Sequence, residues 1–323
     1  MKKKKIIPTL SLSIVLAMGA TAYEANHLYN IYPTKFYEET EDFYYDDLIL
    51  EKIEDSLQQI FNYSSYVPQG LCISNDYFFI SMYDFKKNSN SIINVYDRDG
   101  NFINSCELYN KAHVGGISID FKNNLLWIPS FFGNVDAYRL NDIVCKKKAN
   151  PIYKDLYLGE GLRCYDKPFE SSISYLTYYD NSLYVGNFTL VGKGTIKQYK
   201  VDIDKDGVVR LTEISNFYVP NLVQGLSFYE KNDKKYMLLS RSCGTDMPSI
   251  VQIFIYDEKI DDYTKPIINS RSFHFSPMIE QITNNNESLY SLYESQSMPY
   301  KNETKKDKTL KKSSIDDLLN YIN

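Results

Sequence analysis

The sequence predicts an all-β protein: a single β-propeller of five or six blades, built mostly of four-stranded antiparallel sheets. Three observations lead to this prediction. A short strand pattern recurs five times along the chain, turn residues separate its strands, and the composition includes 30 Tyr and 17 Phe. All-strand repeats spaced by about 40 to 50 residues are typical of propeller blades, and aromatic side chains favour pleated, half-buried surfaces.

Each copy of the repeat opens on a small or polar residue that leads into a short apolar strand. The five openings begin at residues 69, 115, 174, 224 and 280 and read QGLCIS, GGISID, SYLTY, QGLSF and EQIT. Second strands follow over 77–83, 125–130, 183–188, 236–242 and 289–295. Four copies add a third strand ending in Tyr, over 92–96, 135–138, 196–199 and 250–256. Residues 145–170 form the longest irregular insertion between copies.

Two Asp-Gly pairs support the β assignment. Asp99-Gly100 and Asp206-Gly207 each lie between two apolar runs. An Asp-Gly pair in this setting predicts a tight hairpin, because both central positions of that turn require a positive φ.

The chain begins with a pattern that predicts export. Lys2 to Lys5 precede an apolar run from Ile6 to Ala22, which ends in the sequence Ala-Thr-Ala. These features predict a signal peptide over residues 1–22 and a secreted or cell-surface protein. A membrane association is expected only if this segment stays uncleaved.

Residues 23–65 are expected to be a lead-in segment, and residues 66–323 the propeller. Apolar residues at helical spacing predict a short amphipathic helix over 46–62; an outer strand of the last blade is the alternative. The end of the chain also allows two assignments, of which the strand is preferred. The repeat predicts a strand over 314–321, whereas local propensity, with Ser313 or Ser314 as the N-terminal cap, predicts a helix.

Charge and cysteine content narrow the function classes. Without residues 1–22 the chain has 32 basic and 41 acidic residues, a formal net charge of −9. An acidic chain with no basic stripe is not expected to bind nucleic acid, and we expect a monomer. The Lys-rich stretch 301–312 is interpreted as a solvated loop. Of the five cysteines, Cys145 and Cys164 are the pair whose disulfide would close a loop.

Several spaced motifs resemble a family of exported bacterial propeller-like proteins of uncharacterised function. They are HVGGI at 113–117, SYLTY at 174–178, LYVGNF at 183–188, SRS at 240–242 with Gly244, Pro277 and Met278 with Glu280, and LY at 289–290 followed by YES at 293–295. The family pattern has Gly where this chain has Gln281 and an aromatic residue where it has Cys243. More distantly, the chain looks like gluconolactonase-type and quinoprotein-like propellers. That resemblance implies a divalent metal at the centre, for which Glu280 would supply one ligand.

In a closed propeller, the openings of the inner strands become neighbours around the central channel. This places Gln69, His113, Ser174, Gln224 and Glu280 near one mouth, and Arg241 and Glu294 at the ends of second strands near the same place. The candidate ligand-binding residues are therefore Gln69, His113, Gln224, Arg241, Glu280 and Glu294. Amides both donate and accept hydrogen bonds, and Arg can clamp an anion. The alternative is that these groups hold the blades in register.

Residues 202–213 read DIDKDGVVRLTE and match the spacing of a calcium loop. Asp202, Asp204, Asp206 and Glu213 would supply the oxygen ligands to Ca²⁺ or another divalent cation. The flanking sequence is strand-like where an EF-hand requires helices. An acidic β-hairpin without metal is therefore the preferred interpretation of this segment.

Three hypotheses follow for function. The first is a binding protein that takes a small polar or saccharide-like ligand at the channel mouth. The second is a metal-assisted hydrolase or lactonase-like enzyme acting at the same site. The third is a protein-interaction scaffold, which a channel closed by side chains would favour.

Overall fold

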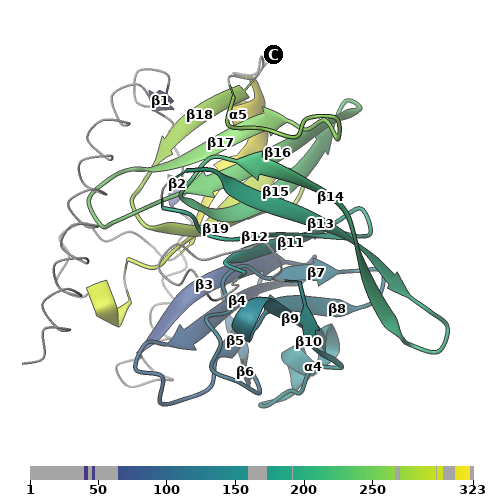
Figure 1. Cartoon of the computed structure of the whole chain (residues 1–323). Coiled ribbons are helices and arrows are strands. Elements are labelled where there is room, and N and C mark those ends of the chain that lie inside the picture. The colour runs from purple at the N-terminus through teal and green to yellow at the C-terminus, as the bar shows by residue number, and fades with distance from the viewer. Residues whose placement is uncertain are drawn as a thin grey trace, which may run out of the picture. The chain divides into compact units, whose positions relative to one another are not determined.

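The structure, a computed structural model, describes residues 40–42, 46–47, 65–158, 173–190, 192–265, 270–295, 297–300 and 310–320. These residues form five antiparallel sheets, and each repeat of the sequence supplies one sheet (Figure 1). The predicted β-propeller is confirmed, and the number of blades is five.

Blade 1 consists of β3 (Tyr66–Ile73), β4 (Tyr77–Asp84), β5 (Ile92–Asp97) and β6 (Phe102–Glu107). Blade 2 consists of β7 (Ser118–Asp120), β8 (Leu125–Pro129), β9 (Asn134–Arg139) and β10 (Tyr153–Tyr157), with the short helices η1 (Phe131–Gly133) and α4 (Leu140–Cys145) between its strands. Blade 3 consists of β11 (Tyr175–Tyr179), β12 (Ser182–Gly186), β13 (Gly194–Ile203) and β14 (Val209–Val219).

Blade 4 consists of β15 (Val223–Lys231), β16 (Lys234–Arg241), β17 (Ser249–Ile255) and β18 (Ser270–Phe275), with β1 (Thr40–Asp42) next to β18. Blade 5 consists of β19 (Ile279–Asn284), β20 (Ser288–Tyr293), β21 (Leu310–Ser314) and β2 (Asp46–Asp47). The helices η2 (Met298–Tyr300) and α5 (Ile315–Asn320) flank β21 in the sequence.

The innermost strands close into a ring. Strands β3, β7, β11, β15 and β19 each contact the next one in this order, and β19 contacts β3. Each inner strand therefore has a neighbour on both sides, and the ring has no open edge. The openings of five sequence-distant repeats meet around one axis, as the sequence predicts.

The hydrophobic core is divided into five clusters, and each one lies between two successive blades. Leu71 and Phe78 of blade 1, for example, pack with Tyr290 and Leu292 of blade 5. Trp127 is fully buried between blades 2 and 3. Because every blade buries both of its faces, no blade can be stable alone.

Tyrosine and phenylalanine fill these clusters where small aliphatic side chains would leave gaps. Between blades 3 and 4, the ring centroid of Phe228 lies 4.6 Å from that of Tyr184, 4.7 Å from that of Tyr179 and 5.1 Å from that of Tyr256. Ring pairs at these separations add to the stability gained by burial alone. The high Tyr content thus has a structural role at a blade interface.

Three sequence-based boundaries need correction. The propeller does not begin at residue 66, because β2 pairs with β21 through Asp46 opposite Lys312 and Asp47 opposite Lys311. Asp46 and Asp47 therefore form an outer strand of the last blade, which is the alternative to the helix predicted over 46–62. The insertion over 145–170 is not wholly irregular, because it contains β10, the outer strand of blade 2. The remaining parts of both segments, 48–64 and 159–172, lie outside the described residues.

The C-terminal segment contains both a strand and a helix. The third strand of blade 5 is β21, which lies before the position that the repeat predicts, and the chain then forms α5. The backbone N–H of Asp317 donates to Ser314 Oγ at 3.2 Å, so Ser314 caps the helix as local propensity predicts. Residues 310–312 of the Lys-rich stretch are strand rather than loop, and Lys311 is buried.

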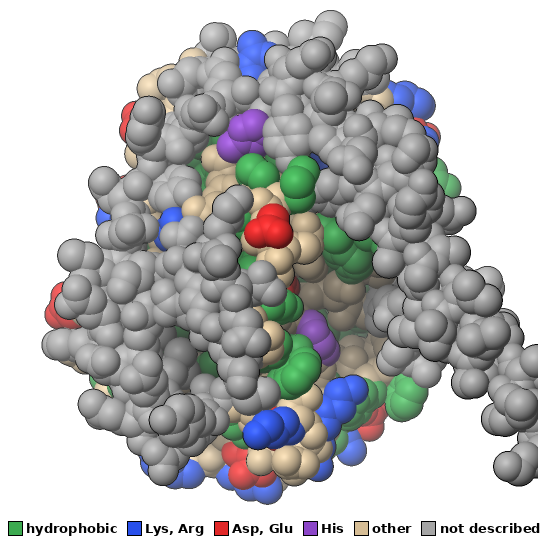
Figure 2. All heavy atoms as spheres, turned by 90° about the vertical axis from the view of Figure 1, so that its left-hand side faces the viewer, with side chains coloured by type: hydrophobic (Ala, Val, Ile, Leu, Met, Phe, Trp, Pro, Cys, Tyr) green, Lys and Arg blue, Asp and Glu red, His purple; other side chains and the backbone are tan. Residues whose placement is uncertain are grey.

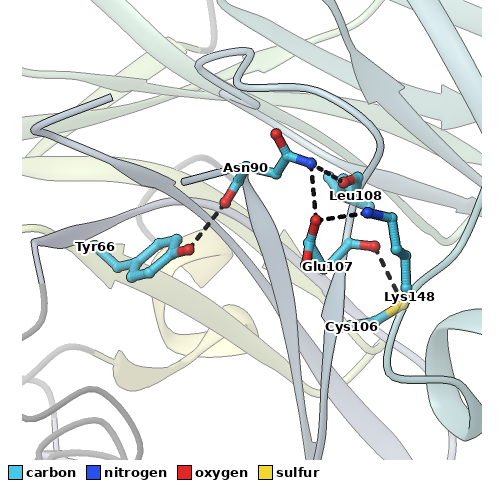
Figure 3. Close-up of polar contacts among 6 residues, drawn as sticks. All are labelled: Tyr66, Asn90, Cys106, Glu107, Leu108 and Lys148. Atoms are coloured by element: carbon cyan, nitrogen blue, oxygen red, sulfur yellow. Dashed lines mark hydrogen bonds and ion pairs between the residues drawn. The ribbon is translucent and has the colours of Figure 1, made fainter. Parts of the chain in front are cut away.

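A polar network ties the chain after α4 to blade 1 (Figure 3). Asn90 Nδ2 and Lys148 Nζ donate to Glu107 Oε1 at 2.8 and 2.9 Å. The hydrogen bond and charge of Lys148 lower the pKa of Glu107, against the effect of partial burial. The Tyr66 hydroxyl donates to the Asn90 carbonyl at 2.9 Å, so the network spans from β3 to the outer strand β6.

Several predictions fall partly or wholly outside the described residues. The signal peptide over 1–22 and residues 301–309 of the Lys-rich stretch are among them. Cys145 is an exposed free thiol, and its suggested partner Cys164 is not among the described residues. None of the helices in the described part of the chain has the length and apolar character that crossing a bilayer requires.

Candidate functional site

The candidate site lies at the end of the channel where the inner strands begin. We call this end the proximal mouth and define it by Gln69, Tyr83, His113, Glu280, Glu294 and Tyr300. These residues come from blades 1 and 5, with His113 on the segment that leads into blade 2. In Figure 2, acidic and histidine side chains lie among hydrophobic ones at a hollow on one face of the molecule.

Two glutamates, the buried Glu280 and the partly exposed Glu294, form an acid pair at this mouth. Glu280 is 7% exposed, and its carboxyl group is hydrogen-bonded to that of Glu294 at the end of the adjacent strand. Burial raises the pKa of Glu280 well above the ordinary value, and the charge of Glu294 raises it further. Because two carboxylates in one site disfavour each other's charge, the pair keeps a proton to a higher pH than a lone glutamate does.

Glu294 accepts hydrogen bonds from two further side chains. Tyr300 donates to its Oε1 at 2.8 Å, and Gln69 Nε2 donates to its Oε2 at 3.1 Å. Burial raises the pKa of Glu294, and the hydrogen bonds from Tyr300, Glu280 and Gln69 partly offset that rise. Gln69 and Glu294 are 225 residues apart in sequence, so this contact exists only because the ring closes.

An aromatic pair lines the same mouth. The rings of Tyr83 and His113 are stacked with centroids 4.4 Å apart, and His113 is exposed. Burial raises the pKa of Tyr83 to about 12, and the charges of Glu294 and Glu280 add to the rise. Tyr83 therefore lies close enough to both acids for their charges to affect its pKa, and its phenol remains neutral. The mouth thus combines a carboxylate, a carboxylic acid, an amide, two phenols and an imidazole.

The other two predicted binding residues, Gln224 and Arg241, have different surroundings. Gln224 precedes Gly225, whose Cα lies so close to blade 5 that an added Cβ would be 3.0 Å from the Glu280 carbonyl oxygen. The backbone at Gln224 therefore lies near that of Glu280, and a role for the Gln224 side chain stays a prediction. Arg241 is 5% exposed, and its guanidinium donates to the Asn221 backbone carbonyl, the Asn221 side chain and Gln252 Oε1 at 2.8, 2.9 and 3.1 Å. These bonds hold the guanidinium of Arg241 in place, and its predicted role as an anion clamp stays a prediction.

Gln281 closes the middle of the channel. Its Oε1 accepts hydrogen bonds from the backbone N–H groups of Leu71 and Ile117, and its Nε2 donates to the Ile117 carbonyl at 3.1 Å. One side chain of blade 5 therefore bridges to blades 1 and 2.

The predicted calcium residues lie along the hairpin of β13 and β14. Asp204 Oδ1 accepts from the N–H groups of Asp206 and Val208 at 3.0 and 2.9 Å, which shapes the turn. Two of the other acids pair with nearby cations: Asp202 with Lys200 at 3.0 Å, and Glu213 with Lys197 at 2.8 Å. In the described segments no group of three or more His, Cys, Asp or Glu side chains is arranged to hold a metal ion. The structure therefore does not bring Asp202, Asp204, Asp206 and Glu213 together.

Sequence reasoning missed three members of this region: Tyr83, Tyr300 and Gln281. Tyr83 ends a second strand, as Glu294 does, and the rule that selected Glu294 selects Tyr83 as well. Gln281 had a visible signal, since three other blades have Gly70, Gly116 and Gly225 at the same place in the repeat. Tyr300 lies in η2, outside the repeat, and no sequence pattern marks it.

Comparisons with known proteins do not assign the chain to a family. No protein-family model matches the chain, and no curated protein matches it. Among solved structures, the chain is similar to the computationally designed Ika8 protein, with 13% identity and a TM-score of 0.32 over 77% of this chain and 71% of that one. It is also similar to the WD40 beta propeller domain of Doa1, with 10% identity and a TM-score of 0.38 over 71% of this chain and 62% of that one.

Proposed function

We propose that this β-propeller is an exported binding protein that takes a small polar or saccharide-like ligand at the proximal mouth. The observation that carries the proposal is the buried pair of Glu280 and Glu294, joined to Gln69 and Tyr300. Burying two acids against each other costs stability, and such pairs with perturbed pKa values concentrate at functional sites.

The chemistry of the mouth suits ligands with several hydroxyl or amino groups. The Glu294 carboxylate can accept hydrogen bonds from such groups, while the amide of Gln69 both donates and accepts. The stacked rings of Tyr83 and His113 offer a flat surface for the C–H face of a sugar. A few polar groups around an aromatic surface are typical of small-molecule sites.

Two features favour binding over hydrolysis. The carboxyl groups of Glu280 and Glu294 are directly hydrogen-bonded, whereas glycosidases hold theirs about 5 Å apart or more, with the substrate between them. A metal-assisted or lactonase-like site would need further ligands beside this pair, and the described residues supply no such cluster. The enzyme hypothesis thus has weaker support than the binding hypothesis.

A protein-interaction scaffold is the second candidate. The hydrogen bonds of Gln281 across the channel favour it, because the scaffold hypothesis predicts a channel closed by side chains.

Export is proposed from residues 2–22 alone. N-terminal sequencing of protein recovered from the culture medium tests it, with Tyr23 as the expected first residue and an intact Met1 as the contrary result.

The binding proposal is tested by isothermal titration of the purified protein with a panel of monosaccharides, disaccharides and small amino alcohols. At least one compound is expected to bind. Glu294→Gln should weaken that binding about tenfold or more, because a charge-assisted hydrogen bond is worth roughly 1.5 to 3 kcal/mol. Gln69→Ala should weaken it less.

Glu258→Gln is the matched control, since Glu258 is an exposed acid between blade-4 strands β17 and β18. It should bind as the unmodified protein does. All variants must retain the near-ultraviolet circular dichroism of the folded protein. If no compound binds, or if Glu294→Gln and Glu258→Gln behave alike, the proximal mouth is not a ligand site.

A further inference from the structure

The opposite end of the channel, where the inner strands end, contains a separate cavity. We call it the distal mouth. It has a volume of about 120 Å³, and residues from all five blades line it. Its lining includes the same position of every repeat, three residues after each opening: Cys72, Ser118, Thr177, Ser227 and Thr283. All five side chains are small, so the backbones of the five inner strands enclose a space at this level.

The lining of this cavity is rich in hydroxyl groups. Ser118 Oγ accepts a hydrogen bond from the Tyr178 N–H at 2.8 Å, and Ser227 Oγ accepts one from Asn284 Nδ2 at 2.7 Å. A hydroxyl that accepts one bond still has its own O–H to donate. Ser118 and Ser227 are 8% and 5% exposed, so a ligand in the cavity is well placed to receive these protons.

An aromatic wall stands beside the hydroxyls. Tyr179 and Phe228 both line the cavity, and their rings are stacked with centroids 4.7 Å apart. Phe121 also lines it and is 66% exposed, which is unusual for a phenylalanine. Aromatic carbon next to hydroxyl donors suits a compound that has both C–H and O–H groups.

The lining contains no Asp, Glu, Lys, Arg or His among the described residues. An ionic ligand placed here would lose its hydration without gaining a counter-charge, and this costs several kcal/mol. The cavity therefore selects for uncharged compounds. Its volume is slightly smaller than that of an engineered cavity of about 150 Å³ that admits benzene. The part of a ligand that this cavity can enclose is therefore limited to about six non-hydrogen atoms.

We propose that the distal mouth is a second binding site, which takes an uncharged polyol, or the polyol end of a larger compound, of about six enclosed non-hydrogen atoms. The side chain of Gln281 lies between this site and the acid pair, because it bridges the channel from blade 5 to blades 1 and 2. The two mouths thus differ in chemistry: one presents a carboxylate, and the other presents only neutral groups. The proposal does not depend on what binds at the proximal mouth.

Cys72 provides a reporter for this site, since its thiol lines the cavity and is 4% exposed. The experiment measures the rate of iodoacetamide alkylation at each cysteine by mass spectrometry in the full-length protein. Glycerol is the probe, and glycerate and 3-amino-1,2-propanediol are charged analogues of the same size. Cys106 is the internal control, because it is buried in the same core cluster but does not line the cavity.

Glycerol is expected to slow the alkylation of Cys72 in a saturable manner, about threefold when its concentration is twice the dissociation constant. Cys106 should be unaffected, and the charged analogues should give no protection. Glycerol also stabilises proteins generally by exclusion from their surface. An equal slowing of Cys72 and Cys106, or equal protection by the charged analogues, overturns the proposal.

A second measurement decides the matter if Cys72 does not react in the folded protein. Saturation-transfer NMR should detect glycerol contact with the unmodified protein and lose that signal in a Ser227→Ala, Thr177→Val variant, which keeps the space but removes two hydroxyls. Glu294→Gln, which alters only the proximal mouth, should leave the signal unchanged. A signal that is absent from the unmodified protein, or that persists in the double variant, contradicts a polyol site.

Discussion

Glu280 illustrates how the position of one residue sets its chemistry. It begins the inner strand of blade 5, where three other blades have Gln69, Ser174 and Gln224. The ring places it against Glu294, and burial then makes its neutral form the stable one. The sequence predicts that Glu280 lies at the mouth. It does not predict the protonation, because that depends on burial and on a neighbour from another strand.

The protonation of Glu280 predicts a specific pH dependence. The folded protein holds a proton that the unfolded chain releases near the ordinary Glu pKa of about 4.3. The free energy of unfolding therefore falls as the pH rises above that value, until the raised folded-state pKa is passed. Glu280→Gln removes this contribution while its amide N–H still donates to Glu294. Its stability should therefore fall less between about pH 5 and pH 8.

Urea unfolding at several pH values measures this difference. Glu258→Gln, at an exposed position, should follow the pH profile of the unmodified protein. Parallel profiles for Glu280→Gln and the unmodified protein would show that Glu280 is ionised like any surface glutamate.

Gln281 shows where sequence reasoning at the residue scale ends. Its departure from the Gly of other blades is visible in the sequence. Its partners Leu71 and Ile117 are 210 and 164 residues away. No local pattern identifies such partners, because the hydrogen bonds form only after five blades have assembled.

At the scale of elements, the last blade explains the most important corrections. Its outer strand β2 comes from the N-terminal side of the chain and pairs with β21. This pairing joins two distant parts of the sequence within one sheet, so the ring is closed by strand pairing as well as by packing. Two-residue strands have no periodicity, so the pattern of apolar residues over 46–62 could not reveal β2.

The segment from Leu310 to Asn320 shows two sequence signals competing. The repeat requires a third strand in blade 5, and β21 supplies it. The capping signal at Ser314 and the apolar spacing of Ile315, Leu318 and Leu319 require a helix, and α5 supplies that. The repeat is right that blade 5 has a third strand and wrong to place it over 314–321, whereas the predicted helix forms over Ile315–Asn320.

The inner strands approach one another closely enough to depend on glycine. A Cβ on Gly116 would lie 2.7 Å from the Leu176 backbone nitrogen and 2.8 Å from Tyr175 Cα in the next blade, and the φ of Gly116 is +68°. Gly207 has a similar φ of +78° but nothing within 4 Å of the added atom. The two residues share a backbone conformation and differ only in surroundings.

Gly116→Ala should therefore destabilise the protein by roughly 3 kcal/mol, from left-handed strain and overpacking together. Gly207→Ala should cost about 1 kcal/mol, from the strain alone. Unfolding in urea measures both. An equal cost for the two variants would mean that blades 2 and 3 are not in close contact at Gly116.

At the scale of the whole molecule, the repeat made the architecture predictable. Five equivalent openings, each with apolar strands on both sides, can bury their faces only by packing blade against blade. The five core clusters show this arrangement, and the two channel mouths follow from it. The sequence alone does not decide between five and six blades, because loops of variable length separate the repeats, and the structure has five.

The composition of the mouths was only partly predictable for a related reason. Repeat equivalence identifies which positions converge, and Gln69 and Glu280 do lie against the same partner, Glu294. It does not determine which partners a side chain takes, and the bonds of Arg241 to Asn221 and Gln252 are not visible in the repeat. Rotamers are selected by neighbours from other blades, and those neighbours are not known until the fold is.

The measurement that most directly tests the account is a double-mutant cycle between Gln69 and Glu294. The ring places Gln69 Nε2 3.1 Å from Glu294 Oε2 although 225 residues separate them in sequence. Unfolding free energies of Gln69→Ala, Glu294→Ala and the double variant should give a coupling energy of about 1 kcal/mol or more at neutral pH. Effects that add to within roughly 0.5 kcal/mol would mean that the two residues do not meet, and would contradict both the closed ring and the acid site built on it.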